Sequence, residues 1–286
     1  MCEESQSGVV CGKSHDAAIY RARMARKRSR LDLVLTERGL FPSRTTAARA
    51  IRAGQVKLGT DGPVALRPSQ DVPPDQAIEI LEARRFVSRG GVKLANALDL
   101  LELDVAGLQC LDVGASTGGF TDCLLQRGAQ HVISLDVAYG QIDDSMRRNE
   151  SVTVIERLNA RDLLPTDLDY RPDLAVIDVS FISLTKVLEA VVNATAVDAR
   201  ILAMVKPQFE LGRTRVGRGG VVRQPEDRRE AVVGIADFAK QLGLSLLGVA
   251  PTGLPGPKGN LETFVDLGRS GAGAASGAAL CEGVDL

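Results

Sequence analysis

The chain has 286 residues, of which 44% are apolar and 25% charged, as in globular proteins large enough for two domains. Five scattered cysteines without a C-x-x-C pair argue against a zinc site and a disulfide framework, and an aromatic content of 3% argues against base stacking on aromatic side chains. No apolar segment has the length of a membrane span or the form of a signal peptide, so we expect a cytoplasmic protein with neither a membrane nor a metal partner.

Positive charge is concentrated near the N-terminus, although the net charge of the chain is only -1. Eleven Lys or Arg residues lie between Arg21 and Lys57, against two acids, Asp32 and Glu37. A basic segment of this kind favours a polyanionic partner such as a nucleic acid. Residues 1–28 have no apolar periodicity, so we expect a flexible basic arm there, with a solvated tail of no function as the alternative.

Residues 29–82 have the pattern of a small separate domain. Helical spacing of apolar residues predicts one helix that ends at Gly39 and a second that begins after Ser43, which can cap it. Gly54 closes the second helix, and short strands are expected at 55–58 and 77–81. The apolar positions of the two helices are Leu31, Val34, Leu35, Ala47, Ala50 and Ile51.

The segment over 30–58, RLDLVLTERGLFPSRTTAARAIRAGQVKL, resembles the S4 RNA-binding domain. The turn that follows departs from the V-N-G usual in that family, because this chain has L-G-T-D-G over 58–62. The alternative is a solvated, arginine-rich face on a helical hairpin. The resemblance implies an RNA-binding surface that contains Arg30, Arg44, Arg49, Arg52 and Lys57.

A linker over 83–88 leads into a second domain over 89–268, whose most informative segment is a glycine-rich turn. A short apolar strand ends at Val113, the turn follows, and a helical pattern begins at Phe120. The spacing D-x-G-x-x-x-G-G resembles the S-adenosylmethionine site of class I methyltransferases, in which the acid can face the ammonium of the cofactor. A glycine turn without a ligand is the alternative. The predicted cofactor residues of this segment are Asp112, Gly114, Ala115, Ser116, Thr117, Gly118 and Gly119.

Further strands alternate with helical segments along this domain. A strand over 131–135 ends in Asp136, which is placed to bind ribose hydroxyls, and a strand over 152–155 precedes Asp162, which is placed near an adenine amino group. Strands are also expected at 174–177, 201–205, 244–249 and 262–265, with a helix over 226–241. The alternation predicts an α/β fold with a doubly wound sheet and its site at the carboxyl ends of the strands. Residues 269–286, rich in Gly and Ala, are expected to be a disordered tail.

Four ionisable residues occupy similar positions relative to these elements: Lys93, Asp178, Lys206 and Glu262. Each alone is more simply a solvated side chain, but three of them should project near one edge of the sheet. Such a group suits methyl transfer to a ribose hydroxyl, a weak acid whose proton must be removed. Lys206 is the candidate base, Asp178 can orient its amine, and Glu262 can hold Lys93 or the ribose. The residues usual for methylation of a base amine or a base carbon are missing from the corresponding loops.

This group resembles the K-D-K-E tetrad of ribose 2′-O-methyltransferases related to the bacterial heat-shock RNA methyltransferase. With the S4-like segment in front, residues 29–268 resemble the TlyA family, on the motifs S-R-G-G-V-K-L over 88–94, D-V-S-F-I-S-L over 178–184 and K-P-Q-F-E over 206–210. The resemblance implies a class I methyltransferase that uses S-adenosylmethionine to methylate cytidine 2′-hydroxyls of 16S or 23S ribosomal RNA, with ribosomal RNA or subunits as partners. The alternatives are a membrane-active hemolysin, as some members are labelled, and a non-catalytic RNA-binding assembly factor.

Overall fold

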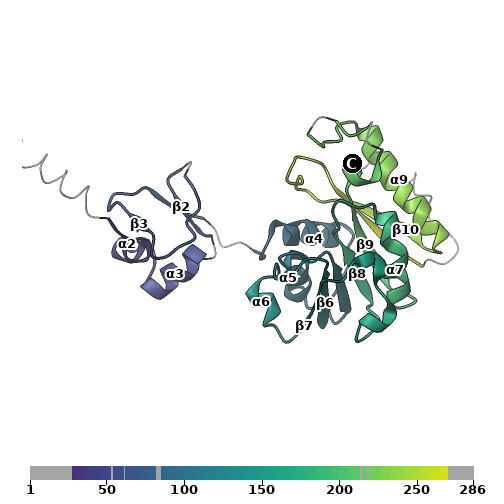
Figure 1. The fold of residues 1–286 in the computed structure, drawn as a ribbon, viewed down its shortest axis with the longest axis horizontal. Helices are drawn as coiled ribbons and strands as arrows, with labels where there is room; N and C mark the ends of the chain where they lie inside the picture. The colour runs from purple at the N-terminus through teal and green to yellow at the C-terminus, as the bar shows by residue number, and fades with distance from the viewer. Residues whose placement is uncertain are drawn as a thin grey trace, which may run out of the picture. The chain divides into compact units, whose positions relative to one another are not determined.

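The computed structural model describes residues 28–52, 54–60, 62–81, 85–212, 215–217 and 219–269. The chain divides into two compact units, 1–84 and 85–286 (Figure 1). Apart from Arg28 and Arg269, the expected basic arm and the expected C-terminal tail lie outside the described residues. Within the described part of the chain, no helix is long and apolar enough to cross a membrane.

The first unit consists of two short helices and two small strand pairs. The expected helices are confirmed as α2 (Leu31–Glu37) and α3 (Arg44–Arg52), and Ser43 Oγ accepts a hydrogen bond from the Thr46 amide at 3.2 Å, as a capping residue does. Strand β1 (Ser29–Arg30) pairs antiparallel with β3 (Asp71–Val72), and β2 (Val56–Leu58) pairs with β4 (Ile78–Ile80). The core of the unit contains the six predicted apolar residues and also Val56, Ala65 and Val72.

The second unit is built on a seven-stranded sheet in the order β10-β11-β9-β8-β5-β6-β7. Its five parallel strands are β5 (Gln109–Val113), β6 (His131–Asp136), β7 (Val152–Glu156), β8 (Leu174–Ile177) and β9 (Arg200–Val205). Strand β11 (Thr263–Gly268) is inserted antiparallel between β9 and β10 (Ser245–Pro251). Thr263 lies opposite Val205, so β11 begins at the same edge at which the parallel strands end.

Helices cover both faces of this sheet. Helices α4 (Arg89–Leu100) and α5 (Gly119–Gln126) pack together on one face, and α7 (Leu188–Ala194) and α9 (Pro225–Gln241) belong to the core on the other. Alternate residues of the strands point to opposite faces: along β8, Leu174 and Val176 join the α4 side, whereas Ala175 and Ile177 join the α9 side. The remaining short helical segments are α6 (Asp144–Arg147), α8 (Pro207–Glu210) and the 3-10 turns Ala160–Asp162, Pro165–Asp167 and Leu184–Lys186.

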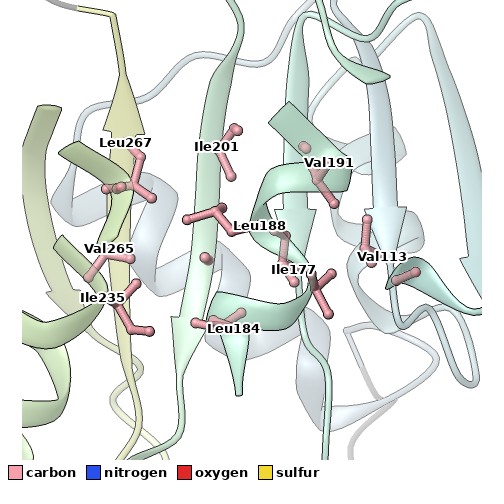
Figure 2. Close-up of a cluster of buried hydrophobic side chains, with 14 of the residues drawn as sticks. Val113, Ile177, Leu184, Leu188, Val191, Ile201, Ile235, Val265 and Leu267 are labelled. Carbon is pink, nitrogen blue, oxygen red and sulfur yellow. The ribbon is translucent and has the colours of Figure 1, made fainter. Parts of the chain in front are cut away.

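Figure 2 shows the core on the α7 and α9 side, where Leu188 and Val191 of α7 and Ile235 of α9 lie over strands β8, β9 and β11. Ile177 and Ile201 face these helices from β8 and β9, and both are fully buried. Burial on two faces explains why the strands have nearly continuous apolar sequences. The packed sheet gives the loops at its carboxyl edge a rigid base.

Candidate active site

A pocket of about 570 Å³ opens at the carboxyl edge of the parallel strands. Its walls come from the glycine turn after β5, the start of α4, the loops after β8 and β9, and the connection between β10 and β11. All four members of the predicted tetrad line it: Lys93, Asp178, Lys206 and Glu262. The antiparallel insertion of β11 brings Glu262 here, because this residue directly precedes the strand.

The tetrad forms two lysine–carboxylate pairs. Lys93 Nζ donates a hydrogen bond to Glu262 Oε2, and the two residues are only 7% and 3% exposed. Lys206 Nζ forms an ion pair with the Asp178 carboxylate and donates a hydrogen bond to Ser180 Oγ at 2.8 Å. The four predicted side chains therefore lie in one pocket. Asp178 contacts the amine that it was expected to orient, and Glu262 contacts Lys93, one of its two expected partners. The contact of Lys206 with Ser180 was not predicted.

The position of Lys93 depends on close packing at the start of α4. Ser88 caps this helix through a hydrogen bond from the Gly90 amide to Ser88 Oγ at 3.2 Å. A Cβ atom on Gly91 would lie 2.4 Å from Phe86 Cγ and 2.7 Å from the Gly119 carbonyl oxygen. Only glycine at this position lets α4 approach the glycine turn, which fixes Lys93 one helical turn from Arg89, the first residue of α4.

The glycine turn packs against the loop that carries Asp178. Gly114 has a φ of +84°, and a Cβ atom there would lie 2.4 Å from the Asp178 carbonyl oxygen. Of the predicted turn residues, Gly114, Ala115, Ser116, Thr117 and Gly119 line the pocket. Gly118 does not line the pocket. It faces the protein interior, where a Cβ atom would contact Met146 and Ile142. The need for glycine at 118 thus comes from its φ of +89° and from internal packing.

Asp112 lies beneath the turn and does not line the pocket. Its Oδ2 accepts hydrogen bonds from the Thr121 amide at 2.9 Å and from Thr121 Oγ1 at 2.7 Å, which fixes the first turn of α5. Its Oδ1 is buried without a hydrogen-bond partner among the described residues. Burial is the main cause that raises the pKa of Asp112 to about 7; the hydrogen bonds from Thr121 oppose this rise, and the nearby carboxylates of Asp178 and Asp136 add to it.

The two acids predicted to bind the adenosyl group lie outside this pocket. Asp136 ends β6 and accepts hydrogen bonds from the amides of Ser116 and Ala138, each at 2.7 Å, so it ties the glycine turn to the neighbouring strand. Asp162 is exposed at the end of the 3-10 turn Ala160–Asp162. The pocket therefore contains the tetrad and the glycine turn, whereas Asp136 and Asp162 are candidates for a surface beyond it.

Sequence reasoning missed an aromatic pair in the pocket wall. The rings of Phe181 and Phe209 are 5.4 Å apart, and Phe181 is 89% exposed on a backbone with a φ of +65°. A non-glycine residue in this conformation is uncommon, and such residues cluster at functional sites. Each phenylalanine follows a tetrad residue by three positions, Asp178 and Lys206 respectively, and this shared spacing was the signal available in the sequence.

A half-buried carboxylate joins the two loops that carry these rings. Glu210 Oε2 accepts a hydrogen bond from Ser183 Oγ at 2.6 Å, and Oε1 accepts one from the Leu184 amide at 3.0 Å. Burial raises the pKa of Glu210 above its ordinary value. The last residue of the K-P-Q-F-E motif thus holds the loop after β8 against the loop after β9.

Comparison with known proteins identifies the second unit. A model of the family described as FtsJ-like methyltransferase matches residues 86–269. A Mycobacterium tuberculosis protein named 16S/23S rRNA (cytidine-2′-O)-methyltransferase TlyA is 47% identical over 241 residues, which cover 84% of this chain and 89% of the relative. The chain belongs to the TlyA family of FtsJ-like methyltransferases. A Bacillus subtilis relative, YqxC, named as an rRNA methyltransferase, is 38% identical over 252 residues, which are 87% of this chain and 89% of that protein.

A solved structure is similar to most of this TlyA-family chain. It is named as a hemolysin from Streptococcus thermophilus and matches with a TM-score of 0.66 at 33% identity, over 88% of this chain and 94% of that one. The hemolysin label thus occurs among proteins that share this fold.

The FtsJ-like unit uses S-adenosylmethionine as its cofactor, and the described residues fit that group. The cofactor has a cationic amino-acid end, and the turn that lines the pocket lies above Asp112 Oδ1, a buried carboxylate oxygen with no partner among the described atoms. Within the described part of the chain, no group of three or more His, Cys, Asp or Glu side chains could hold a metal ion.

In the first unit of this TlyA-family chain, three of the five predicted RNA-binding residues form ion pairs with acidic side chains, and two form none with the described residues. Arg30 donates to both oxygens of the buried Asp32, at 3.0 and 2.9 Å, and Arg44 reaches the same carboxylate at 3.2 Å. The hydrogen bond from Arg30 holds the pKa of Asp32 below its ordinary value. Lys57 pairs with Glu79 at 3.4 Å. The exposed Arg49 and Arg52 have no ion-pair partner among the described residues.

Proposed function

We propose that this chain transfers a methyl group from S-adenosylmethionine to a ribose 2′-hydroxyl of ribosomal RNA, as the name of its Mycobacterium tuberculosis relative states for that protein. The substrate group is then a cytidine of 16S or 23S ribosomal RNA, and the enzyme acts in the cytoplasm on ribosomal RNA or subunits. The main support for this proposal is that two lysine–carboxylate pairs lie in one pocket beside the glycine turn.

Lys206 acts as the base in this proposal. A neutral amine has two N–H groups and one lone pair, and Lys206 has two polar neighbours, Asp178 and Ser180. When the two N–H groups are directed to these neighbours, the lone pair remains for the ribose hydroxyl. Lys206 Nζ would then accept the hydroxyl proton.

Lys93 stabilises the negative charge that develops on the ribose oxygen, and Glu262 holds Lys93 in place through their buried pair. S-adenosylmethionine, when bound, supplies a methyl group that is already activated by the positive sulfur. The turn from Gly114 to Gly119 would hold the cofactor, with Asp112 near its ammonium and with Asp136 and Asp162 at its adenosyl end.

The aromatic pair gives the target base a surface to lie on. Phe181 and Phe209 line the same pocket as Lys206, and each aromatic ring can stack on a nucleobase irrespective of its hydrogen-bond pattern. A low overall aromatic content is therefore compatible with stacking, because two rings at the site are sufficient for one base.

The first unit binds RNA phosphates in this proposal, as an S4-like domain would. Its support is the exposed pair Arg49 and Arg52 on α3, which lie three residues apart and therefore share one helix face. Nothing in the described residues favours the hemolysin or the assembly-factor alternative over an enzyme, since the tetrad and the cofactor turn share one pocket.

The test is methyl transfer by the purified full chain. Radiolabelled S-adenosylmethionine and ribosomal subunits from cells that lack the enzyme are incubated with the protein, and resistance of single phosphodiester bonds to alkali locates each 2′-O-methyl group. We expect label at a cytidine ribose. Label on a base, or no label on either subunit, would contradict the proposal.

A further inference from the structure

The side chains that line the active-site pocket include more cations than carboxylates. Four cationic side chains line it, Arg89, Lys93, Lys206 and Lys258, against two carboxylates, Asp178 and Glu262. Each carboxylate forms an ion pair with one tetrad lysine. Arg89 and Lys258 are both exposed, and neither has an ion pair or a side-chain hydrogen bond with any residue that the structure describes. Two positive charges therefore remain for a ligand.

Both residues are held close to the tetrad by their own segments. Arg89 precedes Lys93 by four residues on α4, so the two side chains share one face of the helix. Lys258 precedes Glu262 by four residues on the connection between β10 and β11, and it lies beside Gly220, since a Cβ atom there would be 3.9 Å from Lys258 Nζ.

The backbone that carries Lys258 is fixed by a buried amide. The Asn260 side chain accepts a hydrogen bond from the Val222 amide at 2.9 Å and donates one to the Gly220 carbonyl at 2.7 Å. The Gly256 amide also bonds to the Asn260 carbonyl at 2.8 Å. These bonds hold the connection against the loop over 219–222, so Lys258 stays at the mouth of the pocket.

We propose that Arg89 and Lys258 bind the RNA phosphates next to the methylated ribose. The inference rests on the proposed function, because a polynucleotide must bring these anions to the site. The 3′-phosphate is attached to the carbon next to the one that bears the 2′-hydroxyl, so a hydroxyl at Lys206 brings a phosphate into the same pocket. The tetrad lysines already face carboxylates, which leaves Arg89 and Lys258 to neutralise it. Arginine can bind two phosphate oxygens at once, and lysine acts as a point charge.

The first test uses the full-length variants Arg89→Gln and Lys258→Gln, singly and together, with Lys240→Gln as the matched control. Lys240 is an exposed lysine of α9 that pairs with Asp237 and does not line the pocket. We expect kcat/KM for RNA to fall roughly tenfold for each substitution, since each loses a charge-assisted contact. The rate at saturating RNA and the affinity for S-adenosylmethionine should stay near wild type.

Salt dependence distinguishes a phosphate contact from a local structural effect. The slope of log Kd for RNA against log salt concentration should fall in magnitude by about 0.7 for each lost contact with single-stranded RNA. The Lys240→Gln control should keep the full slope. A lower rate at saturating RNA with an unchanged slope would overturn the inference, because the residues would then act on chemistry or folding and not on phosphate binding.

A small probe separates this inference from the proposed function. Cytidine and cytidine 3′,5′-bisphosphate are compared as inhibitors of RNA methylation. We expect the bisphosphate to inhibit the wild type at the lower concentration, and this advantage should disappear in the double variant. If the wild type methylates no RNA, the proposed function fails. If it methylates RNA but the bisphosphate has no advantage, or keeps it in the double variant, only the phosphate site fails.

Discussion

Replacing Lys206 by arginine tests the proposed base most directly. Lys206 is 8% exposed, pairs with Asp178 and donates to Ser180 Oγ. Arginine keeps the positive charge and can keep the pair with Asp178, but a guanidinium cannot accept a proton at any pH the protein tolerates. The substitution thus removes the proposed proton transfer while keeping a cationic partner for Asp178.

The expected loss of methyl-transfer rate in Lys206→Arg follows from the proposed role of Lys206 as a general base. Removal of a positioned general base costs roughly two to four decades in rate, or about 3–5 kcal/mol of transition-state stabilisation. The folded state should tolerate the change, because the Asp178 side chain is 27% exposed and retains a cationic partner. Binding of S-adenosylmethionine and of RNA should stay near wild type.

The assay is single-turnover methyl transfer at saturating RNA, which reports chemistry and not product release. Lys186→Arg is the matched control, because Lys186 lies in the 3-10 turn Leu184–Lys186 and does not line the pocket. Thermal unfolding verifies that both variants are folded. A Lys206→Arg rate near that of the wild type would refute the role of Lys206 as the general base and would indicate that it acts only through its charge. The family assignment would not be affected.

Three further predictions concern the buried pair, the first unit and the pH dependence of stability. Glu262→Ala should lower the free energy of unfolding by roughly 3–5 kcal/mol, because it leaves the buried Lys93 without its partner, and urea titration measures this. Replacing both Arg49 and Arg52 by alanine should weaken RNA binding and flatten its salt dependence, with cofactor affinity unchanged by calorimetry. Asp112 keeps its proton up to about pH 7 when folded but only to about pH 4 when unfolded, so its contribution to stability should be lost as the pH rises through this range. The difference in unfolding free energy between pH 5 and pH 8 should therefore shrink in Asp112→Asn.

Most strands of the second unit could be predicted within two residues at each end because of their burial on two faces, whereas β11, expected over 262–265, extends three residues further to Gly268. Strand β8 was expected and found at 174–177, and β6, expected over 131–135, extends by one residue to Asp136. We could also predict that the site lies at the carboxyl edge of the sheet. Neighbouring parallel strands end at the same edge, so the loops after β8 and β9 lie side by side.

The sequence suggested that Asp178 orients Lys206 and that Glu262 holds Lys93 or the ribose, but it could not predict how the fold brings these distant segments together. Lys93 and Glu262 are 169 residues apart, and they meet because β11 enters the sheet antiparallel next to β9. Composition argued against base stacking on aromatic side chains, and it could not show that the loop after β8 leaves Phe181 exposed in the pocket wall. The resemblance to the S4 domain implied Arg30 as an RNA contact, and nothing in the sequence indicated that its guanidinium also binds both oxygens of the buried Asp32.

The glycine-turn motif does not determine which contacts Asp112 makes. The motif predicts that its carboxylate faces the ammonium of the cofactor, whereas Oδ2 holds Thr121 and Oδ1 lies buried without a partner among the described residues. If Oδ1 receives the ammonium, binding must displace the proton that Asp112 carries below about pH 7, so affinity for S-adenosylmethionine must rise with pH up to that value. If Asp112 only fixes the start of α5, binding releases no proton from it. Calorimetric titration in two buffers of different ionisation enthalpy counts the released protons, with Asp112→Asn as the control. A proton released by the wild type and absent in the variant would establish the ammonium contact, and equal release in both would limit Asp112 to holding the helix.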